Sequence, residues 1–149
     1  MKTIRLRNGV FMEDLKHLKA GSTQYKYRIS PGLLDTFPNP RPERTYEVCF
    51  TTHEVTSLCP VTGQPDFYGL TIAYIPEKRC IESKSLKLYL FSLRDTGLFA
   101  EDLANRVLDD LVGCCHPRWI KVICEMSPRG GISLTVKAEH GCRSTEIAD

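Results

Sequence analysis

The sequence predicts an α+β fold in which a four-stranded antiparallel sheet carries two helices on one face. Three observations lead to this prediction. Three segments alternate apolar and polar residues with the period of a strand and a fourth is a short apolar run, while two segments between them repeat apolar residues with the period of a helix. The six elements follow one another in the order ββααββ. Their connections are short, which suits antiparallel pairing and the packing of both helices against the same face.

The first two strands are predicted on either side of a turn-rich sequence, CPVTGQPD. Before it, Tyr46, Val48 and Phe50 alternate with polar neighbours, as in a strand with one buried face. After it, the run FYGLTIAYI is apolar on both faces and ends before Pro76. A run that is apolar on both faces is typical of a strand inside a sheet.

The two helices are predicted in the middle of the chain. The first begins near Ser83 and ends at the sequence DTG. Its apolar residues recur at positions i, i+3, i+4 and i+7 and are Leu86, Tyr89, Leu90 and Leu93. The second helix spans about 99–115, with Glu101 and Asp102 in its first turn, where acidic side chains interact favourably with the helix dipole. Its buried side consists of Ala104, Val107, Leu108, Leu111, Val112 and Cys115.

The last two strands are predicted on either side of the tight turn SPRGG, after a break at His116-Pro117. The alternating residues before the turn are Ile120, Val122, Cys124 and Met126. Those after it are Ile132, Leu134, Val136 and Ala138. Alternation of this kind indicates strands with one face on the core.

The chain 1–149 is predicted to be a single domain, with an irregular N-terminal arm over 1–43 and a core over 44–140. Four prolines in SPGLLDTFPNPRPE remove backbone donors and favour extended or turn conformations. A disordered tail is the alternative, but such tails lack apolar anchors. The anchors expected to dock this arm are Leu33, Leu34 and Phe37.

Length and composition exclude several classes of protein. The chain has 149 residues, of which 42% are hydrophobic and 26% charged, as in one ordinary globular domain. Twenty basic and eighteen acidic side chains leave a formal net charge of +2, so direct nucleic-acid binding is not expected. No apolar run approaches the ~18 residues that span a bilayer, and the N-terminus lacks the apolar core of a signal peptide. We expect a cytoplasmic protein with no membrane partner.

Cys59 is the candidate nucleophile among seven cysteines, an odd number that argues against a complete set of disulfides. It lies directly after a strand, in a loop rich in proline and glycine that would hold its side chain at the surface. Asp66 follows seven residues later. A thiolate can attack an electrophile while a neighbouring carboxyl group transfers the proton. The alternative is a structural thiol in an ordinary loop.

A second candidate site is the sequence ESKSLKLY at the start of the first helix. Lys84 and Lys87 are three residues apart on this helix, beside the hydroxyl group of Ser83. Together with free backbone N–H groups at the helix N-terminus, they suit the binding of phosphate. Arg129 in the SPRGG turn would join them, since the glycines allow close approach of a ligand. The alternative is a solvated helix face.

Glu101, in the sequence FAED, is a candidate for recognising a purine-like ring, because a carboxylate accepts two hydrogen bonds from an N–H/NH₂ edge. Its alternative role is the interaction with the helix dipole.

No metal site is expected. The close clusters of cysteine and histidine lack zinc-site spacing and are Cys114-Cys115-His116 and His140-Gly141-Cys142. The chain also lacks the GxGxxG and GxxxxGK[ST] phosphate loops.

Taken together, TSLCPVTGQPDF, ESKSLKLYLFSLRDTG and SPRGGISL resemble the single-module NADPH-dependent 7-cyano-7-deazaguanine (preQ0) reductases. These are nitrile reductases of queuosine biosynthesis, a tRNA modification, and they have a tunnelling fold. The similarity runs from about Leu33 to Leu134, and ESKSLKLY fits the cofactor motif at every position. The resemblance implies the reduction of preQ0 to 7-aminomethyl-7-deazaguanine (preQ1) with two NADPH.

The resemblance also implies roles for individual residues. Cys59, the cysteine of SLCP, would attack the nitrile carbon and form a covalent thioimide. Asp66 would handle the proton on the substrate nitrogen. Glu101, Phe99 and Ser83 would bind the deazaguanine substrate. The residues expected to bind NADPH are Ser83, Lys84, Lys87 and Arg129.

One position departs from the family pattern. A histidine usually precedes the recognition glutamate, in a phrase like FHED, whereas this chain has Ala100. That histidine helps to bind or protonate the substrate, so we expect thioimide formation to survive and reduction to be slowed. His53, six residues before Cys59, or a water molecule would be the candidate for compensation. An engineered substitution is a further explanation.

Two other functions stay open from the sequence. One is an amidinotransferase like the related archaeal enzymes, which form the same thioimide on deazaguanine in tRNA but lack the cofactor motif. The other is a deazaguanine-binding protein that has lost turnover through Ala100.

A sheet with helices on one face also leaves two edges uncovered. The resemblance implies a homo-oligomer, a pentameric ring or decamer, with active sites between subunits.

Overall fold

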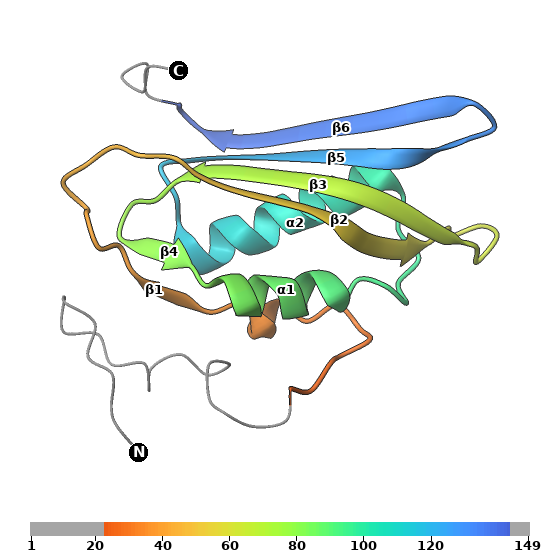
Figure 1. Ribbon diagram of the computed structural model, residues 1–149, viewed down its shortest axis with the longest axis horizontal. Coiled ribbons are helices and arrows are strands. Elements are labelled where there is room, and N and C mark those ends of the chain that lie inside the picture. The colour runs from red at the N-terminus through yellow and green to blue at the C-terminus, as the bar shows by residue number, and fades with distance from the viewer. Residues whose placement is uncertain (1–22, 144–149) are drawn as a thin grey trace.

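A computed structural model describes residues 23–143 of the protein (Figure 1). The predicted fold class is confirmed. Four long strands form one antiparallel sheet in the order β2-β3-β5-β6, and both helices lie on the same face of it. The bounds are β2 Val48–Leu58, β3 Pro65–Ile75, α1 Ser83–Phe91, α2 Ala100–Cys115, β5 Trp119–Arg129 and β6 Ile132–Gly141.

The hydrophobic core lies between the sheet and the helices. In this layer α2 packs against β5 and β6, and α1 packs against β2. The four apolar residues predicted for the first helix are all buried. The core side chains with the least exposure include Leu70, Ile72, Leu93, Leu103, Leu111 and Ile120.

A second, two-stranded sheet was not predicted from the sequence. It pairs β1 (Thr36–Pro38) with β4 (Arg79–Ile81) in antiparallel orientation, and a 3-10 turn at 31–33 precedes it. Strands of three residues are too short to show a clear period. Part of the arm that we expected to be irregular is therefore regular. Leu33 anchors this part in the core with 5% exposure, while residues 1–22 of the predicted arm lie outside the described residues.

Three segments meet at one end of the main sheet. The turn between β2 and β3, the end of β5 and the start of α2 all lie there (Figure 1). Four exposed large apolar side chains lie in or next to these segments, the last two of them at the starts of α2 and β6: Val61, Phe67, Phe99 and Ile132. No helix within residues 23–143 is long and apolar enough to cross a membrane.

Candidate active site

Cys59 begins the turn that joins β2 to β3. Its backbone N–H donates to the Gln64 carbonyl at 2.7 Å, and its carbonyl accepts from the Gly63 N–H at 2.9 Å. These two bonds close the turn and fix the backbone of the cysteine. The side chain is 9% exposed. The predicted thiol is therefore held in place by its turn. It is more buried than the surface position that we expected.

The loop before α2 is tied to the same turn. Leu58 donates its N–H to the Thr96 carbonyl at 2.9 Å and accepts from the Leu98 N–H at 3.0 Å. A Cβ atom at Gly97 would lie 3.2 Å from the Cα of Pro60. Such contacts are tighter than side chains ordinarily make, so glycine lets the two loops approach closely. This contact brings the start of α2 next to the candidate nucleophile.

Hydrogen bonds around Cys59 favour its thiolate. The side chain and then the backbone N–H of Thr62 lower the pKa of the thiol from 9.0 to about 7, with a smaller contribution from the backbone N–H of Val61. Burial opposes this shift, and a hydrogen bond from the Arg129 guanidinium adds to it. Because the thiolate is the nucleophilic form, a pKa near neutrality gives Cys59 substantial reactivity at pH 7.

Asp66 lies one residue into β3, opposite Ser57 of β2. Its side chain is only 3% exposed, and its Oδ1 lies 2.8 Å from Nη1 of Arg129. A buried carboxylate needs such a partner, because leaving it unpaired in the interior is costly. The structure thus brings Cys59, Asp66 and Arg129 together. The sequence analysis had expected Arg129 to join the lysines of the first helix. Within this chain it pairs with Asp66 instead.

Phe99 and Glu101 lie at the start of α2. The Phe99 ring is 58% exposed. The carboxylate of Glu101 is exposed and makes no hydrogen bond or ion pair within residues 23–143. An unoccupied carboxylate beside an exposed aromatic ring can accept two donors from a flat heterocycle while the ring contacts its face. The substrate-binding role of Phe99 and Glu101 stays a prediction.

Ala100 faces the protein interior. It is the first residue of α2, is 3% exposed and packs in the hydrophobic core. His53 lies in the middle of β2, where a Cβ atom at Gly69 would be 3.0 Å from its Nδ1. At a rise of about 3.3 Å per residue, roughly 16 Å of strand separates His53 from the end of β2. His53 of the same chain therefore lies well along β2 from the turn that carries Cys59.

Substituting Ala100→His should destabilise this chain without accelerating it. An imidazole at a core position forces neighbouring side chains apart, and we expect a loss of about 1–3 kcal/mol in the free energy of unfolding. Urea unfolding and steady-state turnover measure the two effects. The control is Asp109→His, which places the same side chain at an exposed position of α2. A variant of unchanged stability with faster turnover would contradict this prediction.

The N-terminus of α1 is occupied by its own cap. The buried carboxylate of Glu82 accepts from the backbone N–H groups of Lys84 at 2.8 Å and Ser85 at 2.7 Å. The expectation that these N–H groups are free to bind phosphate is therefore wrong. The sequence contains a signal for this cap, because an acidic residue, Glu82, directly precedes the predicted helix. The shorter Asp, Asn, Ser and Thr are the more common N-caps, which makes a glutamate easy to miss.

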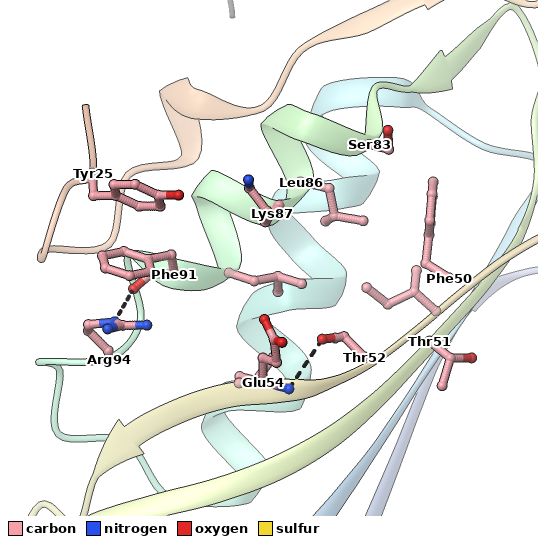
Figure 2. Close-up of a pocket in the computed structure, with 13 residues that line it drawn as sticks. Tyr25, Phe50, Thr51, Thr52, Glu54, Ser83, Leu86, Lys87, Phe91 and Arg94 are labelled. Atoms are coloured by element: carbon pink, nitrogen blue, oxygen red, sulfur yellow. Dashed lines mark hydrogen bonds between the residues drawn. The ribbon is translucent and has the colours of Figure 1, made fainter. Parts of the chain in front are cut away.

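A cavity of about 380 Å³ lies between α1 and β2 (Figure 2). Ser83 and Lys87 line it, whereas Lys84 does not. Sequence analysis missed Arg94, whose guanidinium lies 3.3 Å from the centroid of the Phe91 ring. The aromatic residues of the cavity are Tyr25, Phe50 and Phe91.

The predicted site residues thus form two groups within one chain. Cys59, Asp66 and Glu101 do not line the cavity that holds Ser83 and Lys87. Within the described residues, no cluster of three or more metal-ligating side chains is present.

Comparisons with known proteins agree with the motifs. The sequence pattern of the family described as "QueF-like protein" matches residues 65–145. A protein of Anaeromyxobacter sp. (strain Fw109-5), named NADPH-dependent 7-cyano-7-deazaguanine reductase, is 53% identical over 114 residues, which are 76% of this chain and 93% of the relative. A protein of the same name from Bacillus cytotoxicus is 47% identical over 135 residues, 91% of this chain and 82% of the relative.

A solved structure gives the same result for the fold. The apo form of an archaeosine synthase QueF-Like protein superimposes with a TM-score of 0.61 at 26% identity, covering 66% of this chain and 96% of the other. The α+β class and the tunnelling fold implied by the motifs are therefore correct. On both sequence and fold, the chain belongs to the QueF-like family of NADPH-dependent 7-cyano-7-deazaguanine reductases.

Proposed function

We propose that this protein reduces preQ0 to preQ1 with two NADPH, through a covalent thioimide on Cys59. The observation that supports this function best is that one hairpin carries both buried Cys59 and buried Asp66, with the exposed carboxylate of Glu101 on the adjoining helix. Incubation with preQ0 should consume two NADPH for each preQ1 formed. Oxidation of NADPH without preQ1, or no reaction at all, would reject the proposal.

The first step joins the substrate to the enzyme. Glu101 accepts the N–H and NH₂ donors of the deazaguanine ring and so orients the nitrile. The Cys59 thiolate attacks the nitrile carbon, one π bond of the nitrile breaks, and its nitrogen takes the proton of the Asp66 carboxyl group. The product is a thioimide with a C=N bond. This bond accepts a hydride more readily than the original nitrile does.

NADPH, when bound, supplies the two hydrides. The cavity between α1 and β2 fits the chemistry of this cofactor, because Lys87, Arg94 and the hydroxyl of Ser83 suit its phosphates and the aromatic rings suit its flat bases. We assign Ser83 and Lys87 to cofactor binding. We also assign Lys84 to it, since this residue directly follows Ser83 in α1. Arg94 adds a cation that the motif alone did not indicate.

We infer that the active site is completed between subunits of a homo-oligomer. Cys59 and the cavity belong to different parts of one chain, and β2 and β6 are edges of the sheet. Four exposed apolar side chains surround the Cys59 end of the sheet. A pentameric ring, or two such rings, would cover both edges and bring the cavity of one subunit to the cysteine of the next. Size-exclusion chromatography with light scattering measures the subunit number.

Co-expression of two inactive variants tests this arrangement. We expect Cys59→Ala and Lys87→Ala each to be inactive alone, and mixed oligomers to regain up to about a quarter of the wild-type activity in the simplest random assembly. The recovered sites would combine an intact cysteine from one subunit with an intact lysine from another. Co-expression of Cys59→Ala with Asp66→Asn is the control, because these two residues lie together in one chain. Equal recovery in both pairs would contradict the shared site.

A cytoplasmic location is inferred from the thiols. All seven cysteines lie within the described residues and all are free, which fits a reducing compartment. A free base as substrate also fits the small net charge of +2, because binding to the phosphate backbone of tRNA depends on many basic side chains.

An amidinotransferase is the second candidate, because the matching solved structure is an archaeosine synthase. In that reaction ammonia, rather than hydride, would attack the thioimide. Incubation of the preQ0 adduct with ammonia in the absence of NADPH distinguishes the two functions. Release of an amidine by ammonia would favour the transferase, whereas release of preQ1 by NADPH alone favours the reductase.

A further inference from the structure

The cavity between α1 and β2 has aromatic side chains at both of its ends (Figure 2). Phe50 of β2 and Ser83, the first residue of α1, lie at one end. At the other end Tyr25 and Phe91 pack together, with their ring centroids 4.4 Å apart. Lys87 lies on α1 between the two ends. The cavity therefore offers two places for a flat ring, with a cation between them.

Arg94 is a second cation, and it lies at only one of these ends. Its guanidinium is 3.3 Å from the centroid of the Phe91 ring, so that Phe91 lies between Tyr25 and Arg94 (Figure 2). Its Nε donates to the Phe91 carbonyl at 3.3 Å, and the side chain is half-buried. These contacts hold the guanidinium in place before a ligand arrives. A guanidinium that is already oriented loses less freedom for each hydrogen bond that it forms.

The two terminal nitrogens of Arg94 are available to a ligand. Within residues 23–143 they make no hydrogen bond, and neither Arg94 nor Lys87 forms an ion pair. Among the described residues that line the cavity, Glu54 of β2 is the only one with a carboxylate. It is exposed to water, which screens its charge. Two cations without a paired carboxylate thus border one cavity, as in a site for a ligand with negative charge at two points.

The placement of these cations matches the difference between NADPH and NADH. Both cofactors have two flat bases joined through a diphosphate, and NADPH has a further phosphate on the 2′ oxygen of the adenosine ribose. Lys87, between the two ends, suits the diphosphate that both cofactors share. Arg94, about two helical turns further along the chain, suits a phosphate that lies beside one base only. Its planar fork can bind two oxygens of that phosphate at once.

We propose that Arg94 is the residue that makes this protein select NADPH over NADH, by binding the 2′-phosphate of the cofactor. This inference rests on the proposed function and deepens it. The adenine would then lie against the aromatic pair of Tyr25 and Phe91. The nicotinamide would lie toward Phe50 and Ser83. A residue outside the ESKSLKLY motif thus determines both the choice of cofactor and its direction in the cavity.

Isothermal titration calorimetry with NADP⁺ and NAD⁺ tests this role without turnover. The wild type should bind NADP⁺ more tightly than NAD⁺. In Arg94→Met the affinity for NADP⁺ should fall about tenfold to hundredfold, because a hydrogen-bonded charge pair is lost, while the affinity for NAD⁺ should stay the same. Arg94→Lys keeps the charge without the fork and should lie between the two. Titrations of the preQ0 adduct of Cys59, which NADP⁺ cannot reduce, cover a cofactor that binds only after the substrate.

Two further variants separate selection from general binding. Lys87→Met should weaken NADP⁺ and NAD⁺ by the same factor, because the diphosphate is common to both. Arg41→Met is the matched control, since it removes an exposed arginine that does not line the cavity, and it should change neither affinity. Adenosine 2′,5′-bisphosphate and adenosine 5′-monophosphate serve as probes of the adenosine half alone. Arg94→Met should weaken only the bisphosphate.

Equal weakening of NADP⁺ and NAD⁺ in Arg94→Met would overturn the proposal, because a contact to the shared part of the cofactor, or a damaged cavity, gives that result. An unchanged affinity for NADP⁺ would overturn it as well. So would a wild type that does not discriminate between the two cofactors. Circular dichroism establishes that each variant folds, and Arg94→Lys keeps the test valid if Arg94→Met does not.

The two hypotheses fail separately. If the wild type forms no preQ1 but prefers NADP⁺ through Arg94, the reductase function is rejected and the role of Arg94 stands. If preQ1 forms normally and the preference does not respond to Arg94, only the role of Arg94 is rejected.

Discussion

Replacing Cys59 with alanine is expected to abolish preQ1 formation and the covalent preQ0 adduct together. Without sulfur no thioimide forms, and the free nitrile is a poor hydride acceptor. Removal of a catalytic nucleophile commonly costs about 10⁴–10⁶-fold in rate, so activity should fall below detection. Intact-protein mass spectrometry with preQ0 alone measures the adduct, and loss of NADPH absorbance measures turnover.

The control is Cys49→Ala, because Cys49 is an exposed thiol on the edge strand β2. This variant should retain both the adduct and the turnover. Substrate should still bind to Cys59→Ala, since Glu101 and Phe99 are unchanged. Formation of preQ1 by Cys59→Ala would refute covalent catalysis by this residue, whatever the other variants show.

Long periodic segments made the fold predictable. The strand alternation and the stripe of Leu86, Tyr89, Leu90 and Leu93 depend on burial of one face, which any packed helix or strand must achieve. The three-residue strands β1 and β4 carry no such period. They form because the chain before α1 is held by tertiary contacts, such as the hydrogen bond from the Asp35 N–H to the Ser85 hydroxyl at 2.9 Å. Pairing of this kind, over 50 residues of sequence, leaves no local signal.

The sequence predicted which residue types form the site, but not which of these side chains contact one another. Cys59 and Asp66 are close in sequence because one hairpin turn carries both. Arg129 reaches Asp66 only through the pairing of β3 with β5, so the sequence alone grouped it with the other cations. The inward orientation of Ala100 likewise depends on how α2 rests on the sheet. These features arise from tertiary packing, which is where single-sequence reasoning has the least information.

Replacing Asp66 with asparagine is expected to separate proton transfer from nucleophile activation. Asparagine keeps the size of the side chain but has no acidic proton to give to the substrate nitrogen. Loss of a general acid lowers rates by about 10²–10⁴-fold, so thioimide formation and turnover should both fall in that range. The Thr62 hydrogen bonds, which lower the pKa of the Cys59 thiol most, are left unchanged. Alkylation of Cys59 at pH 7 should therefore be retained or become faster.

Asp102→Asn is the matched control, because it removes an exposed carboxylate next to Glu101 in the first turn of α2. It should change neither the thioimide rate nor the alkylation rate. A general loss of structure in Asp66→Asn would slow alkylation and turnover together, and the unfolding midpoint would fall. Turnover near the wild-type level in a folded Asp66→Asn protein would show that the proton comes from elsewhere. The opposite responses of turnover and alkylation follow only if Asp66 supplies the proton while the Thr62 hydrogen bonds stabilise the thiolate.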